Sequence, residues 1–267
     1  MLEELKMLEL KDIPEEVFPD NTILSGYRGS VAHGMADLRP ESIDDIDIMS
    51  IYIAPLKYYV GLGAGRRYDK SIDKFVGRFD TVSYELRKFV NLLLKSNPNV
   101  LSMLWLNEEY YLMQTPFSKR LIRNRDAFSS KLAYNSYCGY AVSQVKKMTQ
   151  GQVYAGYQGK KRKELVEKFH YDCKNASHCL RLLTQGIEFL KTGELVVYRP
   201  DAQKFLEVKN GLWTLEQVKK EAEKLFAGLE DANTNSPLPD HPKYDIVENV
   251  VMGIILDYYG LEEKQNG

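Results

Sequence analysis

The sequence predicts an α+β protein, in which a small mixed β-sheet is followed by a mostly helical C-terminal domain. Runs of alternating apolar and polar residues, which are typical of strands, concentrate in the first half of the chain. Beyond Pro116, apolar residues recur instead at helical spacing. With 267 residues, the chain is long enough for two domains with cores of their own. We therefore expect a sheet-bearing domain over residues 1–116 and a helical domain over residues 117–267.

The first domain is expected to begin with a short amphipathic helix, Leu2–Leu10. Strands are predicted at Ile23–Arg28, Ile46–Ile53 and Asp80–Glu85, and residues 56–79 are predicted to be irregular. A helix follows directly from Leu86 and stops before Pro98. The apolar stretches 100–106 and 109–113 fit either helix or strand.

The second domain is expected to consist of helices with short connections. They are predicted at Ser118–Asn124, Ala127–Met148, Lys161–Thr192, Leu215–Leu229 and Tyr244–Leu256. Thr214 is a good N-cap for the fourth of these, and Gly193 ends the third. Glu194–Arg199 is the one β-like piece expected in this half.

The composition is that of an ordinary globular protein, with 44% hydrophobic and 27% charged residues. A net charge of −1 argues against a surface that coats long nucleic acids, although it permits a local basic patch. No basic and apolar leader opens the chain, and no apolar run has the length of a membrane span, so we expect a cytoplasmic protein without membrane contact. The three cysteines, Cys138, Cys173 and Cys179, lack Cys-x-x-Cys spacing and indicate neither disulfides nor zinc.

Two aspartates open the second predicted strand. Because side chains alternate along a strand, Asp45 and Asp47 point to the same face. Neighbouring carboxylates repel each other unless a cation lies between them, and oxygen ligands suit Mg²⁺, with Mn²⁺ as an alternative. An isolated Asp-x-Asp is more often a pair of solvated acids. Here Gly29-Ser30, upstream, adds a turn whose backbone N–H groups can hold phosphate oxygens.

Nucleotidyl transfer would need these parts and a third carboxylate for a two-metal site. We choose Glu85, because it ends the third predicted strand and can face the aspartate pair. Asp80, on the opposite pleat of the same strand, is the alternative. The register between the strands decides between the two, and the sequence does not determine it.

A basic helix face is the third candidate feature. Lys174, His178, Arg181 and Gln185 follow one another at i, i+4, i+7 and i+11. Lys174, His178 and Arg181 are expected to bind the triphosphate or the leaving pyrophosphate. A solvent-facing polar stripe explains the same spacing equally well. The Gly/Arg segment 61–67 and the basic run 160–163 are further possible anion contacts, although a surface loop and a solvated helix start explain them more simply.

Together these residues resemble a known family. Gly29-Ser30, followed by Asp45-x-Asp47 and an apolar strand, looks like the signature of the DNA polymerase β-like nucleotidyltransferases. The stretches DTVSYELRKFVNLLLKSNPNVLSMLW (80–105) and YDCKNASHCLRLLTQGIEFLKTGEL (171–195) resemble its branch of bacterial and phage predicted nucleotidyltransferases. The resemblance implies a palm-like α/β domain carrying Mg²⁺ on Asp45, Asp47 and a third acid, and a Gly-Ser turn that grips the triphosphate. Asp44 stands where many members have Ser, and no required group is lost.

The expected activity is transfer of NMP from an NTP, with release of pyrophosphate, to an acceptor that is a small molecule, a protein or an RNA end. The alternative is a nucleotide-binding regulatory or interaction module that keeps the fold without turnover. A domain in which all these residues are surface charge would require several independent coincidences.

Overall fold

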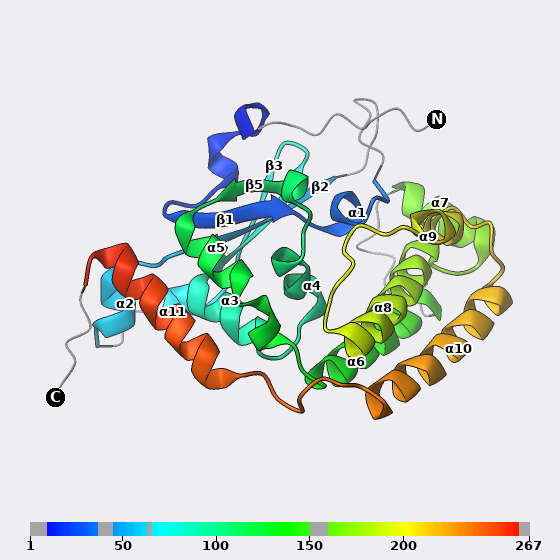
Figure 1. Cartoon of the computed structure of the whole chain (residues 1–267). Coiled ribbons are helices and arrows are strands. Elements are labelled where there is room, and N and C mark those ends of the chain that lie inside the picture. Colours follow the sequence, from blue (N-terminus) through cyan, green and yellow to red (C-terminus); the bar gives the residue numbers. More distant parts are fainter. Residues whose placement is uncertain (1–9, 37–44, 63–65, 150–159, 262–267) are drawn as a thin grey trace. The chain divides into compact units, whose positions relative to one another are not determined.

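The computed structural model describes residues 10–36, 45–62, 66–149 and 160–261. The chain forms two compact units, coloured along the sequence in Figure 1. Unit 1 contains residues 1–94, 99–128 and 242–267, and unit 2 contains residues 95–98 and 129–241. The predicted helix Leu2–Leu10 lies almost wholly outside the described residues.

Unit 1 is built on a five-stranded mixed sheet with the strand order β3-β4-β2-β1-β5. The strands are β1 (Thr22–Tyr27), β2 (Ile46–Tyr52), β3 (Ile72–Val76), β4 (Phe79–Glu85) and β5 (Tyr111–Gln114). The central strands β2 and β4 are parallel, and the other pairs are antiparallel. Thus the predicted α+β class is confirmed, and its three predicted strands correspond to β1, β2 and β4.

Strand β3 lies in the segment that we predicted to be irregular. It pairs with β4 through a tight turn at Gly77, whose φ of +60° favours glycine. The strand lies at the sheet edge, and its three central residues, Asp73, Lys74 and Phe75, are exposed. An edge strand without a buried face has no alternating pattern to reveal it, and charges on such an edge discourage pairing with other chains.

Unit 1 also contains α-helices. They are α1 (Gly29–Ala32), α2 (Leu56–Val60), α3 (Leu86–Leu93), α4 (Pro98–Leu101), α5 (Pro116–Arg123) and α11 (Tyr244–Tyr259). Of these, α1, α3 and α5 contact the strands of the sheet. Helix α3 buries Leu86, Phe89, Val90 and Leu93, the spacing from which it was predicted. Helix α3 contacts β2 and β4, and α5 contacts β1 and β5.

The C-terminal helix α11 belongs to unit 1, and this differs from the predicted helical domain 117–267. Helix α11 contacts α5, where Arg120 forms an ion pair with Asp257 at 2.9 Å. The hydroxyl of Tyr259 donates to the carbonyl of Ala54, next to the sheet. The chain therefore returns to the first unit after completing the second, a long-range pairing that local periodicity does not reveal.

Unit 2 is a helical bundle organised around α8. Its helices are α6 (Leu132–Thr149), α7 (Lys160–Phe169), α8 (Cys173–Thr192), α9 (Ala202–Lys209) and α10 (Leu215–Thr234). Helix α8 contacts α6, α7, α9 and α10. A Cβ on Gly186 would lie 2.9 Å from both Leu229 and Tyr137, so glycine allows α6 and α10 to approach α8 closely.

Two predictions for unit 2 differ from the structure. The helix predicted over 161–192 is two helices, because His170 has a φ of +62° and Asp172 caps α8 by accepting from the N–H of Asn175 at 3.1 Å. The β-like piece Glu194–Arg199 forms no strand. Helix α10 starts after Thr214, which forms a capping box with Gln217.

Cys173 and Cys179 are buried and free, and burial raises the pKa of the Cys179 thiol to about 12. Over the described ranges, no helix combines the length and the apolar character that crossing a membrane requires.

Candidate active site

Two aspartates from neighbouring parallel strands face each other at the start of those strands. Asp47 is the second residue of β2 and Asp80 the second residue of β4, and they are direct partners in the parallel register. Their side chains are 26% and 37% exposed. The sheet thus presents two adjacent carboxylates that solvent reaches.

Arg28 lies between these carboxylates. Its Nη2 atom is 3.5 Å from Oδ1 of Asp47 and 3.5 Å from Oδ2 of Asp80. The Arg28 backbone N–H also donates to the carbonyl of Asp47 at 2.9 Å, which fixes the end of β1 beside β2. The guanidinium therefore relieves the repulsion between two carboxylates that are held close together.

Gly29 brings the backbone directly against Asp47. Its φ is +60°, and an added Cβ would lie 2.1 Å from Oδ2 of Asp47. No other residue type fits this position without moving the carboxylate, because real Cβ atoms do not approach that closely. Ser30 follows in the four-residue helix α1. The structure thus places Gly29 directly beside Asp47. The site was predicted from the presence of Gly29-Ser30 and Asp45-x-Asp47 in the same sequence.

Asp45 directly precedes β2 and is exposed. It lies two residues before Asp47, so both acids are at the same end of the sheet as Asp80.

The structure does not bring Glu85 to the aspartates. Glu85 ends β4, where it is paired with Tyr52, five residues beyond the Asp47–Asp80 pair. Its carboxylate is buried, accepts from the hydroxyl of Tyr59 at 2.5 Å, and caps α3 by accepting from the N–H of Lys88 at 3.1 Å. Burial raises the pKa of Glu85, although both hydrogen bonds oppose the rise. The alternative third acid, Asp80, occupies the position beside Asp47.

The role of Glu85 as a helix cap could have been inferred from the sequence. Leu86 begins α3, and the residue directly before a helix is a capping position. Arg28 was not among our predicted site residues. Arg28 lies between β1 and Gly29-Ser30. A single sequence does not distinguish an arginine at this position from an ordinary surface charge.

The predicted basic face of α8 is largely internal to unit 2. Lys174 is exposed, but Arg181 is buried and donates to Oε1 of Gln185 at 2.6 Å. Gln185 in turn donates to the carbonyl of Val196 at 3.0 Å. Burial lowers the pKa of Arg181 to about 10 and lowers the pKa of His178 well below its usual value. The Nε2 atom of His178 is buried and has no hydrogen-bond partner among the described residues.

The adjacent carboxylates of Asp47 and Asp80 are the candidate ligands for a hard divalent cation in unit 1. Within the described ranges, no group of three or more His, Cys, Asp and Glu side chains is close enough to form a metal site. The paired carboxylates of Asp47 and Asp80 nevertheless provide the oxygen donors that Mg²⁺ prefers. A residue larger than glycine at position 29 would displace the Asp47 carboxylate.

The family model that matches this chain gives its class, a DNA polymerase β-like nucleotidyltransferase. A family model described as "RlaP: RNA repair pathway DNA polymerase beta family" matches residues 2–252, so the chain belongs to that family. Among solved structures, a nucleotidyltransferase-like protein from Exiguobacterium sibiricum 255-15 is similar at 12% identity and a TM-score of 0.28, covering 91% of this chain and 77% of that one. No curated protein matches the chain.

Proposed function

We propose that this protein is a Mg²⁺-dependent nucleotidyltransferase that moves NMP from an NTP to an RNA end and releases pyrophosphate. The observation that carries the proposal is the pairing of Asp47 with Asp80 across two parallel strands, with Gly29 packed against Asp47. The family description names an RNA repair pathway, and this supports an RNA end over a small molecule or a protein as acceptor.

Each acid has a role in this reaction. An acceptor oxygen forms a bond to the α-phosphorus, the bond from that phosphorus to the bridging oxygen breaks, and pyrophosphate leaves with the bond electrons. Asp47 and Asp80 would hold Mg²⁺, which would polarise the α-phosphate. Asp45 is proposed as a further ligand after its side chain moves, because among the described residues no three acids are grouped closely enough for a metal site. The partly exposed carboxylate of Asp80 is also suited to take the proton of the attacking hydroxyl. Glu85 has no part in the proposal, because it caps a helix from a buried position.

Each unit contains donors that are proposed to bind phosphates of the NTP. In unit 1, the N–H groups of Gly29 and Ser30 are proposed to bind phosphate oxygens beside Asp47. In unit 2, Lys174 is the exposed cation of the α8 face and is proposed to contact a phosphate. Arg181 is buried and bonded to Gln185, and His178 is half-buried, so we propose that these two residues support nucleotide binding from within unit 2.

The test follows label from the α-phosphate into an RNA end. The protein is incubated with each α-labelled NTP, Mg²⁺, and RNA oligomers that differ in their terminal hydroxyl and phosphate groups. Labelled RNA and an equal amount of pyrophosphate are expected with Mg²⁺ and not with EDTA. Nucleotide binding without pyrophosphate release would favour the regulatory module, and label in a small molecule or in protein would replace the RNA acceptor. Pyrophosphate release that persists in D47N/D80N would refute the site.

A further inference from the structure

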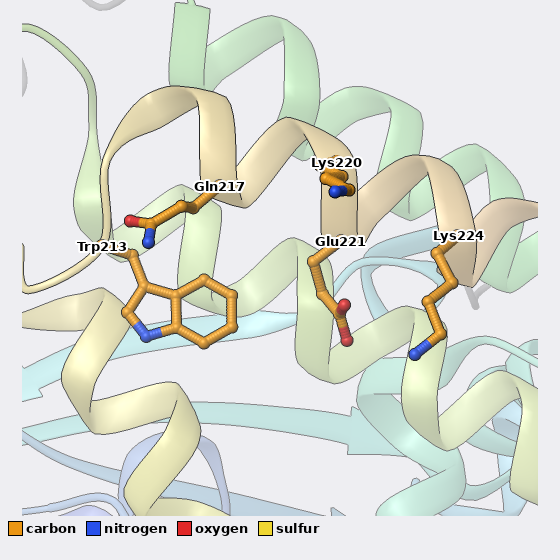
Figure 2. A pocket seen from close by; sticks show the side chains of 5 residues that line it. All are labelled: Trp213, Gln217, Lys220, Glu221 and Lys224. Carbon is orange, nitrogen blue, oxygen red and sulfur yellow. The ribbon is translucent and has the colours of Figure 1, made fainter.

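A groove on the surface of unit 2 combines one aromatic ring with cationic side chains. It has a volume of about 410 Å³ and is lined by Trp213, Gln217, Lys220, Glu221 and Lys224. Figure 2 shows the indole beside Gln217 at one end of the groove and Lys224 toward the other. This volume is within the range of small-molecule sites, which begins at about 300 Å³, and it is large enough for a nucleotide base with its sugar.

Trp213 is held in place by contacts with its indole N–H, its backbone carbonyl and one face of its ring. Its Nε1–H donates to Oε2 of Glu207 at 3.4 Å, and its carbonyl accepts from the hydroxyl of Tyr171 at 2.7 Å. The ammonium of Lys204 lies 5.8 Å from the ring centroid. The side chain is nevertheless only half-buried. A positioned and partly exposed indole offers a face on which a planar base can stack at little entropic cost.

The charge around the ring is positive. Glu221 is neutralised by Lys204, whose Nζ is 2.6 Å from its Oε1, and this bond lowers the pKa of the Glu221 carboxyl. Lys220 and Lys224 are exposed, and neither is ion-paired with a described carboxylate. They are one helical turn apart on α10, a separation of about 6 Å along the axis. Two cations at that spacing can each neutralise one of two successive phosphates of a nucleic-acid strand.

We propose that this groove binds single-stranded RNA, with one base stacked on Trp213 and the flanking phosphates on Lys220 and Lys224. The combination of an aromatic platform with a basic track is the usual means of holding single strands without reading their sequence. The choice of RNA deepens the proposed function and rests on it. The binding site itself lies wholly within unit 2 and requires none of the acids of unit 1.

The test measures the binding of a fluorescent single-stranded RNA 12-mer to the full-length protein, without NTP and in EDTA, by anisotropy. Trp213→Leu is expected to weaken binding about tenfold, whereas Trp213→Phe, which keeps a stacking face, is expected to recover most of it. Lys220→Gln with Lys224→Gln is expected to lower the slope of log K against log salt by about 1.4, because each phosphate that a lysine neutralises contributes about 0.7 to that slope. Lys219→Gln with Lys191→Gln removes two exposed lysines that do not line the groove, and should produce a smaller change.

The outcomes separate this inference from the proposed activity. Wild-type protein that binds no RNA, or variants in Trp213 and the two lysines that bind as wild type does, would overturn the groove assignment. D47N/D80N is expected to bind RNA like the wild type while it loses transfer. If RNA binding depends on Trp213 but no nucleotide is ever transferred, then the proposed function fails and the binding site stands.

Discussion

Asp47 and Asp80 are register partners on two parallel strands, and a single nitrogen of Arg28 lies 3.5 Å from a carboxylate oxygen of each. Because neighbouring carboxylates repel each other, a positive charge beside them is stabilising. In the structure Arg28 provides that charge, and in the proposed reaction Mg²⁺ would provide more of it. The relationship therefore links the stability of this end of the sheet to its chemistry.

Removing the Arg28 charge should make the protein's stability depend on metal. In Arg28→Gln the two carboxylates repel each other, and because both are partly exposed we expect a loss of about 1 kcal/mol or less in EDTA. Added Mg²⁺ should restore more stability to this variant than to the wild type. Thermal unfolding with EDTA and with Mg²⁺ measures both effects. Arg120→Gln, which breaks a different ion pair of unit 1, is the control. An identical Mg²⁺ response in Arg28→Gln and wild type would contradict the account.

Gly29 and Gly77 form a matched pair for testing the close approach to Asp47. Both have a φ of +60°, but only Gly29 would place a Cβ against a carboxylate, since nothing lies within 4 Å of a Cβ on Gly77. Each change to Ala should cost about 1–2 kcal/mol for the backbone conformation. Gly29→Ala should in addition lower transfer about 100-fold, because the Asp47 carboxylate must move. Thermal unfolding and label transfer are measured on both variants, and equal activity in the two would show that the close approach has no role.

Titration of Glu85 should make the free energy of unfolding depend on pH, and the Glu85→Gln variant should lack this dependence. Its folded-state pKa is raised above 4.5, chiefly by burial, so the folded state holds the proton more strongly than the unfolded state does. Its contribution is therefore full below pH 4.5 and is lost as pH rises through the folded-state pKa. Relative to wild type, Glu85→Gln should gain stability as pH rises across that window. Denaturation midpoints between about pH 4 and 8 test this, and parallel profiles for the two proteins would refute it.

Arg199 should be a major determinant of the stability of unit 2. Its buried guanidinium donates to both carboxylate oxygens of Glu188, at 2.5 and 2.9 Å, and to Asp201 at 2.8 Å. Arg199→Ala leaves these acids without their partner, but they are 35% and 37% exposed, so water replaces part of the lost interaction and we expect a loss of about 1.5–3 kcal/mol. Lys131→Gln, which breaks the more exposed pair with Asp240, should cost less than about 1 kcal/mol. Urea denaturation compares the two, and similar losses would show that burial of the Arg199 pairs has no special weight.

The sequence predicted those features that depend on local pattern. Strand β2 and the placement of Asp47 on it follow from alternation, and α3 follows from helical spacing. The family expected from Gly29-Ser30 and Asp45-x-Asp47 is confirmed. These signals extend over a few residues, and a single sequence contains them in full.

Features that depend on long-range contacts were not predictable in this way. The register of β2 against β4 decides that Asp80, and not Glu85, lies beside Asp47, and nothing local specifies that register. Arg181 was assigned to a polar face by its spacing, but α8 is surrounded by four other helices and buries that face in part. Periodicity describes one helix, whereas burial depends on all of its neighbours.

Three single variants, compared for transfer of α-labelled nucleotide to RNA in Mg²⁺, test the role of the Asp47–Asp80 pair. If Asp47 and Asp80 form the reactive pair, Asp47→Asn and Asp80→Asn should each lower the rate about 100-fold or more. Glu85→Gln, assayed where it remains folded, should keep a rate close to that of the wild type. An active Asp80→Asn variant together with an inactive, folded Glu85→Gln variant would contradict the account.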